Sequence, residues 1–359
     1  MPLRTLNREK IILRRRIIAE FCEHAEIYEG RLQGAPIACK LIDGEELEIA
    51  GYERLKNEVN ILEVEWLRRL VHPYILRLHS STVAGPYLCL TTDLADMRAA
   101  TNVIKDYYPL GLPEPALRII LKQLFKALTY MHARNVVHRG IRACHILIDS
   151  KSGVKLTGFR HSVHLKHTAK NRPDYDAVTH AYDAQLENCL LWLAPEIISQ
   201  DIDGYGLASD IYSVGITLCE MANGAGPFTE MDPFTLLAEK TGGTVPCLLD
   251  SITGEACNVV ERTAHYNRTF TKDLHWLVAS CVALDPADRP TAQYFLEKSS
   301  LRKAKSRHLR KALERVQLET QKPDEDIADH FVDLTGCEDL EWLETNAHGN
   351  KMMIDGNPT

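Results

Sequence analysis

The sequence predicts an α+β protein of two lobes, in which a strand-rich first lobe is followed by a helix-rich second lobe. Short β-like segments fill the first part of the chain, including residues 36–42, 75–83 and 87–94, and one helix is expected at about residues 54–70. From Pro113 onward the apolar residues recur at spacings of three and four, which is typical of helices with one buried face. This order of elements argues against a repeating βαβ sheet.

Helices dominate the second part, and two short strands are expected within it, at His145–Ile148 and Gly153–Leu156. The buried stripe of its first long helix is predicted at Leu117, Ile120, Leu121, Leu124, Leu128 and Met131. Later helices are expected at residues 206–222, 233–240, 272–282 and 291–299. A last helix is predicted within Leu301–Leu318, where the apolar residues at helical spacing are Leu309, Leu313 and Val316.

Composition and charge narrow the class of protein. The chain has 359 residues, 45% of them hydrophobic and 25% charged, which is ordinary for a soluble globular protein. A net charge of −7 gives no reason to expect nucleic acid as a partner, and no apolar run approaches the roughly 18 residues of a membrane helix. The ten cysteines form no Cys-x-x-Cys pair and are expected to be reduced thiols. We therefore expect a cytoplasmic protein, with the nucleus as a second compartment, and no membrane partner.

The chain divides into three predicted parts. Residues 1–17 form a basic leader, either strapped over the first lobe or extended as a solvated arm. Residues 18–301 form the two-lobed domain, with the first lobe at about 18–94 and the second at about 95–301. Residues 302–359 form a tail that contains a helix and then becomes acidic and loop-like.

Residues 136–148 have the frame of a protein kinase catalytic loop but lack the residues that perform the chemistry. Active kinases place an Asp there to accept the proton of the attacking hydroxyl and an Asn to hold magnesium. Here Gly140 stands at the Asp position and His145 at the Asn position. Further on, Gly158 replaces the magnesium-binding Asp of Asp-Phe-Gly. We expect no catalytic residue, no bound metal, and a protein-kinase-like fold kept for binding.

Other kinase landmarks remain in order. Lys40 ends a segment that resembles the Val-Ala-Ile-Lys strand, and Glu63 lies where kinases place the partner of that Lys. A surviving nucleotide contact and a plain salt bridge are both open interpretations of this pair. Glu196, in Ala-Pro-Glu, is expected to pair with Arg289, and Asp210 to hold the second lobe together.

A nucleotide site, where one survives, is expected to be degenerate. With Ile27 at the valine position of the glycine loop, the glycine positions are Glu20, Cys22 and Ala25, whose side chains hinder approach to phosphates. We expect no required cofactor, and ATP bound without magnesium stays an open hypothesis because Arg142 and Arg160 add positive charge nearby. The candidate nucleotide-binding residues are Ala38, Lys40, Glu63, Thr92, Leu94 and Leu147.

Three histidines follow Phe159 at regular spacing. His161, His164 and His167 are three residues apart, so a zinc site is conceivable. No Cys or acidic partner stands at ligand spacing, which favours a polar loop instead.

Several longer segments resemble the sterile-20-related adaptor (STRAD) pseudokinases over roughly residues 18–301. They are Val137–Arg139 with His145–Ile148, Ser209–Thr217, Gly243–Asp250 and Tyr266–Phe270. The resemblance implies a catalytically dead protein that binds a liver kinase B type serine/threonine kinase together with a mouse-protein-25 (calcium-binding-protein-39) type scaffold. It further implies allosteric activation of that kinase through the activation-segment side, here including parts of His161–Leu191.

The tail departs from the family pattern. Members often end in Trp-Glu-Phe, which inserts into the scaffold, whereas this chain has Trp342 and Leu343 followed by further residues. These two residues are the candidate scaffold anchor, and packing of Trp342 on the chain's own tail is the alternative. Two rival functions are an atypical, weakly active serine/threonine kinase that uses Lys40, and a scaffold that binds neither nucleotide nor liver kinase B.

Overall fold

The computed structural model describes residues 11–17, 25–32, 34–43, 60–84, 87–151, 153–165, 178–182, 184–253, 267–298, 300–305, 308–316 and 330–332. These residues fall into two compact units, which are described separately. The first unit draws on residues 1–64, 77–94 and 321–359, and the second on residues 65–76 and 95–320. Among the described residues, no helix is long and apolar enough to cross a bilayer.

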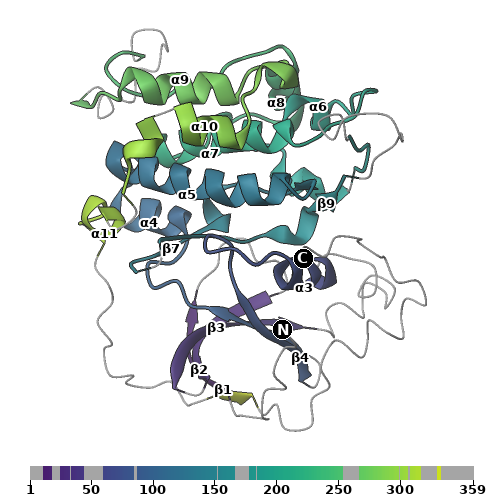
Figure 1. Cartoon of the computed structure of the whole chain (residues 1–359), viewed down its shortest axis with the longest axis vertical. Helices are drawn as coiled ribbons and strands as arrows, with labels where there is room; N and C mark the ends of the chain where they lie inside the picture. Colours follow the sequence, from purple (N-terminus) through teal and green to yellow (C-terminus); the bar gives the residue numbers. More distant parts are fainter. Residues whose placement is uncertain are drawn as a thin grey trace. The chain divides into compact units, whose positions relative to one another are not determined.

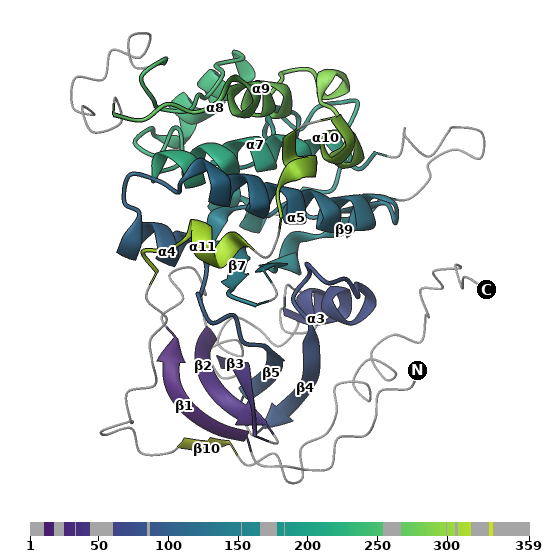
Figure 2. The ribbon, with the colours of Figure 1, turned by 60° about the vertical axis from the view of Figure 1, so that its left-hand side comes forward.

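An antiparallel sheet forms the first unit, with its six strands in the order β10-β1-β2-β3-β5-β4 (Figures 1 and 2). In β3, alternating apolar side chains such as Ile37 and Cys39 are buried, which is the period expected of a strand with one face in a core. The strands are β1 (Ile11–Ile17), β2 (Ala25–Leu32), β3 (Ala35–Asp43), β4 (Leu78–Ala84), β5 (Tyr87–Asp93) and β10 (His330–Val332).

The segment predicted as a basic leader contributes to this sheet. Residues 11–17 pair with β2 as strand β1, and Leu13 is buried in the core of the first unit with Ile37. Residues 1–10 lie outside the described residues. Residues 11–17, predicted as part of the leader, therefore form a strand of the sheet, and the predicted boundary after residue 17 falls at the end of that strand.

Helices pack in layers in the second unit. The central α5 (Glu114–His132) packs against α7 (Ala208–Asn223) and α10 (Ala292–Lys298), and α7 also packs against α9 (Lys272–Cys281) (Figure 1). The predicted stripe of α5 is confirmed, since all six of its residues have no exposed surface. The remaining helices are α4 (Ala100–Tyr107), α6 (Pro195–Ile198), α8 (Pro233–Thr241) and α11 (Leu309–Ala312), with α3 (Asn60–Arg69) starting in the first unit.

Short strands and 3-10 turns lie between the helices of the second unit. Strand β6 pairs with β9, and β7 pairs with β8. Their bounds are β6 (Val136–Val137), β7 (Ile146–Asp149), β8 (Gly153–Leu156) and β9 (Val163–His164). The 3-10 turns are η1 (Ala143–His145), η2 (Phe159–His161), η4 (Ala184–Cys189), η6 (Pro286–Asp288) and η7 (Ser300–Lys303).

Three predicted elements differ from the structure. The strand predicted from Ile75 begins at Leu78, because Ile75 follows a turn and makes an isolated bridge to Leu156. His145 was expected in a strand but closes η1, where its N–H donates to the Arg142 carbonyl.

Within residues 301–318, where a tail helix was predicted, the described residues form only a four-residue helix, α11, after the turn η7. Lys122 of α5 donates to the carbonyl of Arg302 within η7 and to that of Ala304 directly after it. The apolar spacing nevertheless marked core positions, as Leu309, Leu313 and Val316 are buried.

Candidate functional site: a catalytic loop without its acids

Asp210, at the start of α7, holds the loop that follows β6. Its carboxylate is fully buried and accepts hydrogen bonds from the backbone N–H groups of His138 (2.9 Å) and Arg139 (3.0 Å). His132 Nε2 lies 3.0 Å from the same carboxylate. Arg139 has a left-handed backbone with φ of 59°, which is uncommon for a residue with a side chain. The bonds to Asp210 hold this conformation and so fix the backbone of the loop that resembles a kinase catalytic loop.

The Arg139 side chain extends this frame to neighbouring segments. Its guanidinium donates to the carbonyl of Ala181 (2.9 Å), to the hydroxyl of Tyr205 (2.8 Å) and to the carbonyl of His161. The guanidinium is therefore committed to neutral oxygens within the second unit.

Gly140, the residue predicted to stand at the proton-acceptor position, lies in space that would admit a side chain. A Cβ built there would lie 3.4 Å from the Gly158 carbonyl oxygen and 3.5 Å from His138 Nδ1, which are ordinary contacts. Packing therefore does not require a glycine at this position.

Gly158 differs from Gly140, because another residue fills its side-chain space. Its φ is 83°, and a Cβ would lie 2.4 Å from His145 Nδ1 and 2.5 Å from His145 Cγ. The imidazole of His145 thus stands where a magnesium-binding side chain at position 158 would begin. The side chain of His145 therefore occupies the side-chain space of Gly158, and the two positions depend on each other.

The contacts of His145 assign its tautomer and charge. Nδ1 lies 2.6 Å from the Gly140 carbonyl oxygen and Nε2 lies 3.3 Å from an Arg142 guanidinium nitrogen. A neutral ring that donates from Nδ1 and accepts at Nε2 satisfies both contacts. Burial, followed by the nearby Arg142 charge, holds the pKa of His145 well below 6.5.

These residues do not fit magnesium. The ion requires near-octahedral oxygen ligands, and neither Gly140 nor Gly158 has a side chain to supply one. Both nitrogens of His145 are engaged by protein groups. Within the part of the chain that the structure describes, no group of three or more His, Cys, Asp or Glu residues is arranged to hold a metal, and His167 of the considered zinc site lies outside it.

In the first unit, the retained lysine and glutamate meet. Lys40 on β3 has its Nζ 2.9 Å from Glu63 Oε2 on α3, and the Glu63 side chain is 8% exposed. Ala38 and Thr92 are directly opposite each other in the β3–β5 ladder. The structure thus joins two pairs of the candidate nucleotide-binding residues.

The other candidates lie elsewhere. Leu94 ends the first unit, whereas Leu147 is on β7 of the second unit and bridges Ala99. Glu20 and Cys22 lie outside the described residues, as do Trp342 and Leu343, so their roles stay predictions.

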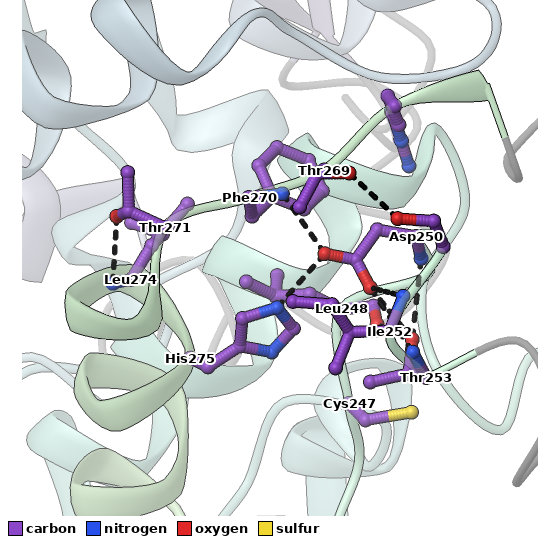
Figure 3. Close-up of polar contacts among 12 residues, drawn as sticks. Cys247, Leu248, Asp250, Ile252, Thr253, Thr269, Phe270, Thr271, Leu274 and His275 are labelled. Atoms are coloured by element: carbon purple, nitrogen blue, oxygen red, sulfur yellow. Dashed lines mark hydrogen bonds and ion pairs between the residues drawn. The ribbon is translucent and has the colours of Figure 1, made fainter.

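Two segments that carried the family resemblance meet around Asp250 (Figure 3). Its buried carboxylate accepts from the N–H groups of Ile252 and Phe270, each at 2.9 Å, and lies 2.9 Å from His275 Nε2. Burial alone would raise the pKa of Asp250, but the hydrogen bonds from Phe270 and His275 hold it below its ordinary value. The residues that carry the family resemblance in these two segments therefore make structural contacts around Asp250.

Two charged residues, the buried Lys240 and the partly buried Glu220, were not predicted from the sequence. Lys240 follows the buried Leu236 by four residues on α8, and Glu220 follows the buried Ile216 by four on α7. A charge at the spacing of an apolar stripe is the signal that could have identified both.

A match to a known family identifies the class of protein to which this chain belongs. Residues 23–300 match the family model described as "Protein kinase domain". The match covers most of the chain, and the sheet of the first unit and helices of the second agree with it. The prediction of an α+β protein-kinase fold is confirmed.

The chain belongs to the STE20-related kinase adapter family, as its sequence indicated. STE20-related kinase adapter protein strd-1 of Caenorhabditis elegans is 36% identical over 232 residues, or 63% of this chain and 58% of that protein. STE20-related kinase adapter protein alpha of Bos taurus is 33% identical over 264 residues, 66% of this chain and 69% of that protein. The human alpha protein has the same identity, with 60% of its length covered. The chain thus spans less than two thirds of the nematode and human relatives.

Proposed function

We propose that the chain is a catalytically inactive, kinase-like adapter that binds and allosterically activates a partner serine/threonine kinase of the liver kinase B type. A mouse-protein-25 type scaffold completes the proposed complex. The observation that carries the proposal is the contrast at the catalytic loop. Asp210 and Arg139 hold the loop in shape, while His145 fills the space beside Gly158 where a metal ligand belongs.

The chemistry of the loop supports inactivity. No Asp or Glu occurs between His138 and Ile148 to replace the lost proton acceptor, and a positioned general base contributes about 10²–10⁴ in rate. Metal ions supply several kcal/mol of charge stabilisation in phosphoryl transfer, and the residues at Gly140, His145 and Gly158 do not fit one.

Activation by binding requires that the active form of the partner fits the adapter better than its inactive form. A surface held by buried side chains suits this task, because a fixed shape selects one conformation of the partner. We place the kinase-binding surface on parts of His161–Leu191, and the scaffold anchor at Trp342 and Leu343. The relatives' printed name, kinase adapter, supports a kinase as the partner.

We further propose that any bound ATP is held without magnesium. In this proposal Lys40, which pairs with Glu63, contacts the phosphates. ATP should then raise the melting temperature equally in magnesium and in EDTA. No shift at millimolar ATP would remove nucleotide from the proposal without affecting the adapter role.

Reconstitution tests the function. The purified chain is mixed with the liver kinase B type kinase and the mouse-protein-25 type scaffold, and phosphorylation of a peptide by the partner is measured. We expect activity well above that of the kinase with scaffold alone. A pull-down of the scaffold with Trp342→Ala tests the anchor, with loss of scaffold capture as the expected result. No gain on adding the wild-type chain would refute the adapter function.

A second candidate, a weakly active kinase, is favoured by one observation, the retained Lys40–Glu63 pair at 2.9 Å. It predicts stoichiometric peptide phosphorylation by the highly pure chain alone, abolished in Lys40→Met. The adapter proposal predicts no transfer by either protein, so one assay separates the two.

A further inference from the structure

Two buried side chains take every backbone carbonyl of the segment Leu190–Leu193. Lys240 Nζ donates to the carbonyls of Leu190 (2.9 Å), Leu191 (2.7 Å) and Leu193 (2.7 Å). The hydroxyl of Ser213 donates to the remaining one, that of Trp192, at 2.8 Å. The segment directly precedes Ala194-Pro195-Glu196 at the end of the activation segment. We refer to Leu190–Leu193 with these two side chains as the carbonyl clamp.

The chemistry of Lys240 matches the clamp. An ammonium group has three donors, and each reaches one carbonyl here. The planar guanidinium of an Arg would place its donors differently. Lys240 is only 1% exposed, and burial lowers its pKa to about 7. Burying a charge is costly unless it is hydrogen-bonded, so the three carbonyls account for its presence in the core.

The Trp192 side chain connects the clamp to the degenerate catalytic loop. Its indole N–H donates to Glu220 Oε2 at 2.7 Å, and the same oxygen accepts from the N–H of Ala143 at 3.1 Å. The Arg142 guanidinium lies 5.5 Å from the centre of the indole ring and also contacts His145. Contacts thus run without a break from Lys240 on α8 to the residues beside Gly140.

The opposite end of α8 faces solvent. Phe234, in its first turn, is 85% exposed, while Asp232 caps the helix by accepting from the N–H of Phe234 at 3.0 Å. The helix therefore presents an apolar side chain at one end and fixes the clamp with the other. Any displacement of α8 would move Lys240 relative to the carbonyls that it holds.

We propose that Lys240 is a positioning residue for partner binding, which fixes Leu190–Leu193 as a rigid docking segment and ties that segment to the catalytic loop. This inference rests on the proposed adapter function and extends its kinase-binding surface by one residue, to the partly buried Trp192, because Leu193 has no exposed surface. Lys240 is buried and acts through the backbone that it holds, without touching the partner itself.

The test compares Lys240→Met with the wild-type chain. Met keeps the length of the side chain and removes all three donors. Lys311→Met, at an exposed lysine of α11, is the matched control. Circular dichroism and thermal unfolding select folded protein, hydrogen–deuterium exchange reports on the amides of residues 190–193 and of Ala143, and titration with the partner kinase gives the dissociation constant. Ser213→Ala is the second variant, since it removes a single donor and keeps Lys240.

In Lys240→Met we expect faster exchange both in residues 190–193 and at Ala143, and on the order of tenfold weaker kinase binding if the docking shape falls to about a tenth of the population. Ser213→Ala should show the same pattern to a smaller extent, and Lys311→Met neither effect. A folded Lys240→Met protein that binds the kinase within twofold of wild type would overturn the inference alone. If Lys240→Met does not fold, unchanged exchange and binding in Ser213→Ala would overturn it. Absence of binding by the wild-type chain would overturn the adapter function, and the docking role with it.

Discussion

Replacing Gly158 by Ala should destabilise the protein mainly through contact with His145. The new Cβ would lie 2.4 Å from His145 Nδ1, and the ring cannot swing away without losing its bond to the Gly140 carbonyl at 2.6 Å. A left-handed φ of 83° costs a residue with a Cβ about 1–2 kcal/mol, and overpacking of a filled site adds about 1–3 kcal/mol. The expected loss of unfolding free energy is therefore about 2–5 kcal/mol.

A double-mutant cycle separates these two contributions. In a His145→Ala background the overpacking is relieved, so Gly158→Ala should cost about 1–2 kcal/mol and the coupling should be about 1–3 kcal/mol. Gly34→Ala reports the cost of φ alone, because its φ is 80° and nothing lies within 4 Å of the added carbon. Gly140→Ala, with ordinary contacts from 3.4 Å, should change stability little.

Urea unfolding followed by circular dichroism gives the four free energies of the cycle. Equal costs of Gly158→Ala in the two backgrounds, within about 0.5 kcal/mol, would refute the claim that the imidazole fills the side-chain space of position 158.

Two other predictions concern charged groups of the second unit. Arg289→Met removes both guanidinium bonds to Glu196, at 2.6 and 2.9 Å, and should lower the free energy of unfolding in urea by about 3–5 kcal/mol. Adding Glu196→Gln should restore part of this loss. A loss below about 1 kcal/mol would contradict the buried pair. Burial raises the pKa of Glu220 from 4.5 to about 7 despite the hydrogen bonds that it accepts, so its native carboxyl binds a proton more tightly than the unfolded one. The stability of the wild type relative to Glu220→Gln should therefore be greatest below pH 4.5 and fall by about 3 kcal/mol as the pH rises to about 7, and a difference independent of pH would be inconsistent with that shift.

The fold was predictable because its signals are local or carried by ordered motifs. The apolar stripe of α5 follows from helical periodicity, and Glu196, Asp210 and Arg289 were recognised as supports from their motifs, a role that their buried contacts fit. The tail was less predictable, because periodicity marks buried positions such as Leu313 and does not show where a helix begins and ends.

The sequence predicts which catalytic and metal-binding residues the candidate site lacks, but not which side chains fill their space. The sequence shows a His at position 145, but only the fold brings its ring against Gly158 and gives each nitrogen a partner. The interactions of Lys240 with residues about fifty positions earlier in the chain likewise depend on tertiary packing. A charged residue at the spacing of an apolar stripe can be recognised in the sequence as a candidate buried charge, but its hydrogen-bond partners cannot.

The pairing of β10 with β1 has a practical consequence for shortened versions of this protein. Val332 stands opposite Ile11 and His330 opposite Leu13, so a few tail residues shield backbone groups of β1 that would otherwise be open to other chains. Trimming the chain at about residue 320, where the helical unit ends, would uncover that border and invite self-association between molecules. Expression work should therefore keep His330–Val332 attached even when the residues beyond them are removed.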